Sequence, residues 1–166
     1  SYIADAYWNV NKEKEATEFY KKAIKSGDRN AFFMLSLLYL SYKRFAEAED
    51  ISRNAIVYDA KNRFLLLESL RNQKKITLSE GKKIIGSISR EESNIFLICY
   101  ILGNFYQDQG EITEAIVWYE KADFLEEGRD TRPLKKLLAL YKKIGYLSKI
   151  KKIEKRILKL NTKKLN

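Results

Sequence analysis

Histidine is absent from the 166 residues of this chain. Because histidine is the commonest general base and the commonest transition-metal ligand, its absence excludes His-based catalytic triads and zinc sites. Cysteine occurs once, at Cys99, so no internal disulfide framework is possible. A single cysteine favours a reducing compartment, and we expect a cytoplasmic location.

Proline occurs once and glycine seven times, whereas hydrophobic residues make up 45% and aromatic residues 13% of the chain. This composition argues against disordered, collagen-like and linker-rich classes and is typical of a globular helical protein. No run approaches the ~20 consecutive apolar residues that a membrane-spanning helix needs. The sequence opens at Ser1 without a methionine, so a signal peptide, a lipid anchor or a preceding domain could have been removed.

Patterns that carry catalysis or cofactor binding are also missing. Residues 81–86 contain glycines and lysines but lack the spacing of a phosphate-binding loop and a strand before it. Cys99 falls in an apolar run, which favours burial over activation as a nucleophile. The carboxylate pairs at 91–92 and 126–127 are typical of solvated charge at helix ends. We therefore expect no catalytic residue, metal or cofactor, and a protein that is not an enzyme.

Positive charge is concentrated at one end of the chain. The formal net charge is +10, but residues 131–166 hold 13 Lys and Arg against the single acid Glu154, which gives +12 there and leaves −2 for residues 1–130. The basic character therefore belongs to the C-terminal segment.

A unit of 30-odd residues repeats along the sequence. Pairs of alanines seven residues apart occur at Ala16 and Ala23, Ala48 and Ala55, and Ala115 and Ala122. Seven residues are two helical turns, so each pair lies on one face and lets a neighbouring helix approach closely. A tyrosine stands nine residues before each first alanine, at Tyr7, Tyr39 and Tyr106.

Two further segments keep the length of a unit but lose most of its markers. Residues 63–93 read as a degenerate repeat and residues 131–162 as a looser last one. In the first segment we expect Leu66 and Leu70 in one helix and Ile84, Ile85 and Ile88 in the next. The apolar positions of the second segment are Leu134, Leu137, Leu138, Tyr141, Ile150, Ile153 and Ile157.

Helix-end signals support this organisation. The spacings Thr77–Glu80 and Ser89–Glu92 predict capping boxes, and Pro133 fits the first turn of a helix. Glycines stand where helix C-termini are expected, at Gly27, Gly110, Gly128 and Gly145. No segment alternates with period two between hairpin turns, so we predict no sheet.

The chain resembles the tetratricopeptide repeat family. The best unit reads Leu102-Gly103-x-x-Tyr106, followed by Gly110, Ala115, Tyr119 and Ala122. The N-terminal units, with the short join inside 16–31, are similar to the related Sel1-like repeats. The resemblance implies an all-α fold, an α-solenoid in which about five helix-turn-helix repeats stack into a right-handed superhelix. It implies one repeat domain over 1–166, with units near 1–28, 29–62, 63–95, 96–130 and 131–162.

Stacked helix pairs cover one another's apolar faces and leave a concave surface along the first helices. The resemblance implies that this groove binds a partner. The matching positions are Asp5, Trp8, Asn9, Asn30, Phe33, Leu37, Ser41, Arg71, Lys74, Lys75, Tyr100, Asn104, Gln107, Asp108, Arg132, Lys135, Lys142 and Lys143. Trp8, Phe33 and Tyr100 fit repeat packing as well as groove exposure. Asn104 with Arg71 and Lys135 partly matches the carboxylate clamp of some family members.

The C-terminal segment reads as an amphipathic basic helix, with an apolar stripe and cations elsewhere. Its cations are Lys149, Lys151, Lys152, Lys155, Arg156 and Lys159. One interpretation is a terminal cap of the array, with charge toward water. The other is a patch for an acidic protein, an anionic membrane or nucleic acid.

A non-catalytic protein-interaction adaptor or scaffold is the function that these observations favour. The groove would run from apolar to basic, which fits a partner protein or peptide with apolar and acidic parts. A polyanion-binding module, acting on nucleic acid or an anionic membrane surface through the basic C-terminal repeat, is the alternative.

Overall fold

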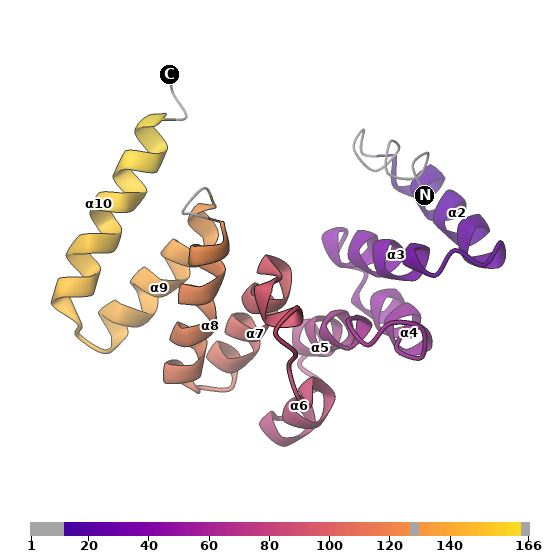
Figure 1. Cartoon of the computed structure of the whole chain (residues 1–166), viewed down its shortest axis with the longest axis horizontal. Helices are drawn as coiled ribbons and strands as arrows, with labels where there is room; N and C mark the ends of the chain where they lie inside the picture. The colour runs from indigo at the N-terminus through magenta and orange to yellow at the C-terminus, as the bar shows by residue number, and fades with distance from the viewer. Residues whose placement is uncertain (1–11, 127–129, 164–166) are drawn as a thin grey trace. The chain divides into compact units, whose positions relative to one another are not determined.

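The structure, a computed structural model, describes residues 12–126 and 130–163 of the chain. Within these ranges every regular element is a helix, with nine α-helices, one 3-10 helix and no strand (Figure 1). The predicted all-α fold is therefore confirmed. The chain divides into two compact units, residues 1–86 and 87–166. The division into five repeats within one domain stays a prediction, as does the right-handed superhelix.

The first unit is a succession of helices that pack on their neighbours in chain order. Its helices are α2 (Glu13–Lys25), α3 (Asn30–Ser41), α4 (Phe45–Ala55), α5 (Asn62–Asn72) and α6 (Leu78–Ile85). α3 also contacts α5, which places the first helices of two successive hairpins side by side. This is the arrangement that stacking of helix pairs requires.

The second unit has the same organisation. It begins with the 3-10 helix η1 (Glu92–Asn94) and continues with α7 (Phe96–Asp108), α8 (Ile112–Leu125), α9 (Thr131–Lys143) and α10 (Leu147–Lys163). Helices α7 and α8 form one hairpin, and α8 packs on α9 and α9 on α10.

The repeat markers lie in the cores of the two units. Ala16 and Ala48 are fully buried in a cluster formed by α2, α3 and α4, and Ala115 is fully buried in a cluster formed by α8, α9 and α10. Gly103 of α7 faces the ring of Tyr119, and a Cβ atom added to Gly103 would lie 2.6 Å from two ring carbons. The small residues thus permit close helix packing, as the alanine spacing predicts.

The predicted helix ends agree with the structure where it describes them. The Thr77 side chain accepts from the Glu80 N–H at 3.3 Å, and the Glu80 carboxylate accepts from the Thr77 N–H at 3.0 Å. Likewise, the Ser89 side chain accepts from the Glu92 N–H at 3.1 Å, and the Glu92 carboxylate accepts from the Ser89 N–H at 2.9 Å. Three of the four predicted glycines end a helix with positive φ, at Gly27, Gly110 and Gly145, and Gly128 lies outside the described residues.

The prediction of a helix through Ile88 is wrong. Helix α6 ends at Ile85 after eight residues, because Gly86 follows with φ +57° and turns the chain out of the helix. The third predicted unit therefore has an unusually short second helix.

None of the helices in the described ranges is long and apolar enough to cross a membrane.

Candidate binding surfaces

Two half-buried aromatic rings of α7 and an exposed guanidinium group of α9 form a cluster. Phe96 and Tyr100, one helical turn apart on α7, stack with ring centroids 5.9 Å apart. The Arg132 guanidinium lies 5.4 Å from the centroid of each ring. Cation–π geometry of this kind is attractive and keeps the arginine over the rings. We call Phe96, Tyr100 and Arg132 the aromatic–arginine cluster.

Asp130 fixes the arginine of this cluster at the start of α9. Its carboxylate caps the helix by accepting from the Arg132 N–H at 2.8 Å and also accepts from the Arg132 Nε–H at 2.7 Å. The hydrogen bond from Asp130 is the main cause of a raised pKa at Arg132. Tyr100 and Arg132 were predicted as groove residues, and the structure brings them together. Phe96 was missed, although its place four residues before Tyr100 puts it on the same helix face.

Two other predicted groove residues of α7 hold Tyr119. The Asn104 side chain is only 7% exposed, and its carbonyl oxygen accepts from the Tyr119 hydroxyl at 2.7 Å. The Gln107 carbonyl oxygen lies 2.9 Å from the same hydroxyl. The structure thus assigns Asn104 a contact inside the α7–α8 hairpin and leaves Gln107 half-buried beside it. That either one contacts a partner stays a prediction.

The predicted groove residues of the first unit do not form a cluster like that of Phe96, Tyr100 and Arg132. Phe33 and Leu37 are half-buried on α3, and Asn30 is exposed at its first residue. Arg71 pairs with Glu68 on the same helix at 2.6 Å, which neutralises much of its charge. The further positions Ser41, Lys74 and Lys75 are exposed. Asp5, Trp8 and Asn9 lie outside the described residues.

Exposed lysines continue along α9 beyond the aromatic–arginine cluster. Lys135 and Lys143 are exposed, and Lys142 is exposed but pairs with Glu154 of α10 at 3.0 Å. Asp108 is exposed at the end of α7. The predicted clamp of Asn104, Arg71 and Lys135 stays untested, and Arg71 and Asn104 already have partners within their own helix hairpins.

The cations of α10 divide into two groups. Lys149 pairs with Glu120 at 2.8 Å, and Arg156 donates two hydrogen bonds to Asp123, at 2.7 and 3.0 Å. These contacts hold α10 against α8 and support the interpretation as a terminal cap. The remaining cations of the predicted patch are exposed, namely Lys151, Lys152, Lys155 and Lys159.

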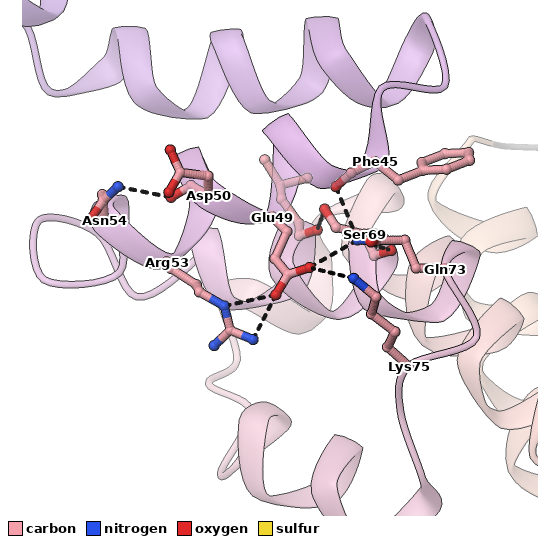
Figure 2. A network of polar contacts seen from close by, with 9 residues as sticks. Phe45, Glu49, Asp50, Arg53, Asn54, Ser69, Gln73 and Lys75 are labelled. Carbon is pink, nitrogen blue, oxygen red and sulfur yellow. Dashed lines mark hydrogen bonds and ion pairs between the residues drawn. The ribbon is translucent and has the colours of Figure 1, made fainter.

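Glu49 is the centre of a polar network between α4 and α5 (Figure 2). Its carboxylate accepts from Arg53 Nη2 at 2.8 Å and from Gln73 Nε2 at 2.9 Å, and Lys75 Nζ lies 3.9 Å away. Burial acts to raise the pKa of Glu49, but the bonds from Arg53 and Gln73 outweigh burial, so the pKa lies below its ordinary value. Sequence reasoning missed this network, because Glu49 and Gln73 are 24 residues apart.

The chemistry of Cys99 agrees with the prediction of a small buried hydrophobe. Its side chain is fully buried in α7, and burial raises the pKa of the thiol to about 11. A thiol with such a pKa is protonated at neutral pH and is a poor nucleophile.

Among the described residues, no group of His, Cys, Asp and Glu side chains is arranged to hold a metal ion.

Two segments of the chain match the model of the tetratricopeptide repeat family, residues 3–26 and 97–123. The second segment spans most of the α7–α8 hairpin. A comparison with curated proteins found no match.

Solved structures of repeat proteins are similar to the chain over nearly its whole length. A structure of MamA is 20% identical with a TM-score of 0.66, covering 98% of this chain and 90% of that one. MamA 41-end from Desulfovibrio magneticus RS-1 is 12% identical with a TM-score of 0.64, covering 96% and 90%. YrrB, described as a TPR protein with an unusual peptide-binding site, is 15% identical with a TM-score of 0.61, covering 95% and 82%. The fold is therefore that of an all-α helical repeat.

Proposed function

We propose that this chain is a non-catalytic adaptor that binds a partner protein or peptide along the first helices of its repeats. The observation that carries the proposal is the aromatic–arginine cluster. Phe96 and Tyr100 offer apolar area on α7, and Arg132 offers a positive charge that Asp130 holds in place. Aromatic and arginine side chains are the residues most enriched at the energetic centres of protein interfaces.

The partner suited to this surface combines an apolar group with an acidic one. The rings supply the surface that an apolar side chain would bury, and Arg132 and the exposed Lys135 supply the charge that would orient a carboxylate. The similarity to a peptide-binding TPR protein supports a peptide as one form of this partner.

The polyanion alternative keeps one specific observation in its favour. Four lysines of α10 are exposed on the described surface, namely Lys151, Lys152, Lys155 and Lys159. Binding that is carried by such a lysine cluster weakens steeply with salt, because it depends on counterion release. Binding that is carried by buried apolar area survives high salt. The two functions can therefore be separated in one experiment.

A capture experiment with the immobilised chain would separate them. We expect partners from a cell lysate to stay bound in about 1 M salt, where the Debye length is about 3 Å, and to be lost with Tyr100→Ala or Arg132→Ala. Arg90→Ala, at an exposed arginine outside the cluster, is the matched control and should retain them. The polyanion function would be favoured instead if both cluster variants still captured the partners and capture were lost when the four exposed α10 lysines became glutamate.

A further inference from the structure

The first unit contains a pocket, and Lys75 is the one predicted groove residue among the described residues that line it. It has a volume of about 310 Å³ and lies between α4, α5 and α6. This volume is at the lower end of the range of about 300–1,000 Å³ for ligand pockets. Leu70 of α5, Ile76 of the following loop and Ile84 of α6 are its apolar lining. Arg53, Lys75, Glu80 and Lys83 are its charged lining.

The pocket exists because α6 is short and packs with few of its residues. Only Gly81 and Ile85 of this helix are buried, and Ile84 is left half-buried at the pocket. Both ends of α6 are nevertheless held in place. The Thr77–Glu80 capping box fixes its start, and the Arg63 Nε–H donates to the Ile85 carbonyl at 2.9 Å near its end. A pocket on fixed elements binds without a large ordering cost.

The charged lining favours an acidic ligand. Glu49 holds Arg53 at the pocket through two hydrogen bonds, and Lys75 lies near the same carboxylate (Figure 2). Glu80 accepts hydrogen bonds from the Thr77 N–H and hydroxyl, at 3.0 and 2.7 Å, and keeps its negative charge. The lining holds three cations, Arg53, Lys75 and Lys83, and one carboxylate, Glu80. Counting Glu49, which lies beside Arg53 and Lys75, still leaves one positive charge in excess. Lys83 is exposed.

We propose that this pocket binds an acidic peptide segment of a partner protein through one aliphatic anchor side chain. An aliphatic side chain covers Leu70, Ile76 and Ile84, and flanking Asp or Glu residues pair with Lys83 and Lys75. An inorganic anion would leave the apolar lining uncovered. Single-stranded nucleic acid needs aromatic rings on which bases stack, and none of the described residues that line the pocket is aromatic. The inference rests on the proposed protein-binding function but places a contact on a different surface.

Methyl NMR on the full chain tests the anchor. The probe is an acidic decapeptide with one central leucine flanked by glutamate and aspartate. Titration should shift the methyl resonances of Leu70, Ile76 and Ile84. Replacing the leucine of the peptide with serine should weaken binding by about tenfold or more, because a buried leucine contributes a factor of that size. Equal shifts from the serine peptide, or from inorganic phosphate, would overturn the proposal.

Two neighbouring lysines of α6 provide a matched pair for the charge. Both are exposed, but only Lys83 lines the pocket. Lys83→Glu should weaken binding of the leucine peptide by about tenfold, and Lys82→Glu should weaken it by no more than about twofold. The two variants change the net charge equally and differ only in their distance from the pocket. Equal weakening would reduce the effect to net charge and contradict the proposal.

The pocket and the adaptor function can fail separately. Tyr100→Ala should leave the peptide titration unchanged, because Tyr100 is not part of the pocket. A failed titration together with capture that still depends on Arg132 would overturn the pocket alone. If the peptide titration succeeds but capture of partners is unchanged in Tyr100→Ala and Arg132→Ala, the proposed binding role of the aromatic–arginine cluster is wrong and the pocket proposal stands.

Discussion

The α7–α8 and α5–α6 hairpins occupy corresponding places in the repeat pattern but close their interiors differently. Helix α8 has 14 residues and buries Ala115, Tyr119 and Ala122, whereas α6 has eight and buries Gly81 and Ile85. In the first hairpin the Tyr119 ring lies directly over Gly103. Beside the second hairpin, a pocket lies between α4, α5 and α6. The repeat markers therefore report how closely two helices pack, and their loss leaves a cavity that can take a ligand.

Truncating one apolar residue in each hairpin should show the difference most strongly. Leu102→Ala removes a fully buried side chain of α7 and should lower the free energy of unfolding by about 3 kcal/mol. Ile84→Ala removes a half-buried side chain beside the pocket and should cost about 1 kcal/mol. Guanidinium unfolding followed by circular dichroism measures both, and hydrogen exchange localises the loss. Equal losses would show that α5–α6 is packed as tightly as α7–α8.

Filling the space above Gly103 should also destabilise the chain. Gly103→Ala gains about 1 kcal/mol of helix propensity, but its Cβ would lie 2.6 Å from the Tyr119 ring. Overpacking of this kind costs about 1–3 kcal/mol, and the Tyr119 hydroxyl bond to Asn104 prevents an easy shift of the ring. We expect a net loss of up to about 2 kcal/mol in thermal or chemical unfolding.

A second substitution tests whether the ring is the cause. In a Tyr119→Leu background the ring carbons that the new Cβ would meet are gone, so Gly103→Ala should become neutral or stabilising. A double-mutant cycle measures this coupling. Additive effects would mean that the close approach of α7 and α8 does not depend on the glycine.

Acid should weaken the joint between α4 and α5 through Glu49. Because its pKa is depressed in the folded chain, Glu49 contributes stability that is present above its ordinary pKa of 4.5 and is lost as pH falls through the folded value. Glu49→Gln should cost about 1 kcal/mol at neutral pH, and the difference from the unmodified chain should shrink below pH 4.5.

The exposed neighbour Asp50 is the control for this effect. Asp50→Asn removes one negative charge on the same helix and should change stability by less than about 0.5 kcal/mol at neutral pH. If the two variants had the same pH dependence, the acid effect would come from net charge and not from the bonds of Arg53 and Gln73.

The sequence predicted the fold because its evidence is periodic and local. Alanine spacing, the Thr77–Glu80 box and the helix-ending glycines each depend on residues close together in the chain, and the structure confirms them where it describes them. The sequence-based prediction missed the end of α6. Isoleucines at 84, 85 and 88 suit a helix, and the prediction did not weigh the terminating Gly86 against them.

The candidate surfaces were harder to predict, because they depend on which side chains meet across helices. Tyr100 and Arg132 were identified from the family register, but their contact needs α7 and α9 placed together. Asn104 carries the same register signal and instead bonds Tyr119 inside its hairpin. The pocket beside Lys83 has no motif at all, since it results from the absence of markers in α6.

Replacing the exposed carboxylate of Glu120 on α8 has the smallest expected effect on stability, but it should change the pKa of Tyr141 measurably. Glu120 accepts from the Tyr141 hydroxyl at 2.7 Å and from Lys149 at 2.8 Å. Burial, followed by the bond to Glu120, raises the pKa of Tyr141 to about 12. The neutral phenol therefore contributes stability that is complete below the ordinary value of 10 and is lost as pH rises toward 12.

Glu120→Gln should cost only about 0.5 kcal/mol at neutral pH, since the pair with Lys149 is exposed. The pKa of Tyr141, read from tyrosinate absorbance, should fall from about 12 but stay above 10, because burial, its largest cause, remains. Tyr141→Phe assigns the titration to this residue. An unchanged pKa in Glu120→Gln would show that the negative charge of Glu120 does not contribute to the raised pKa of Tyr141.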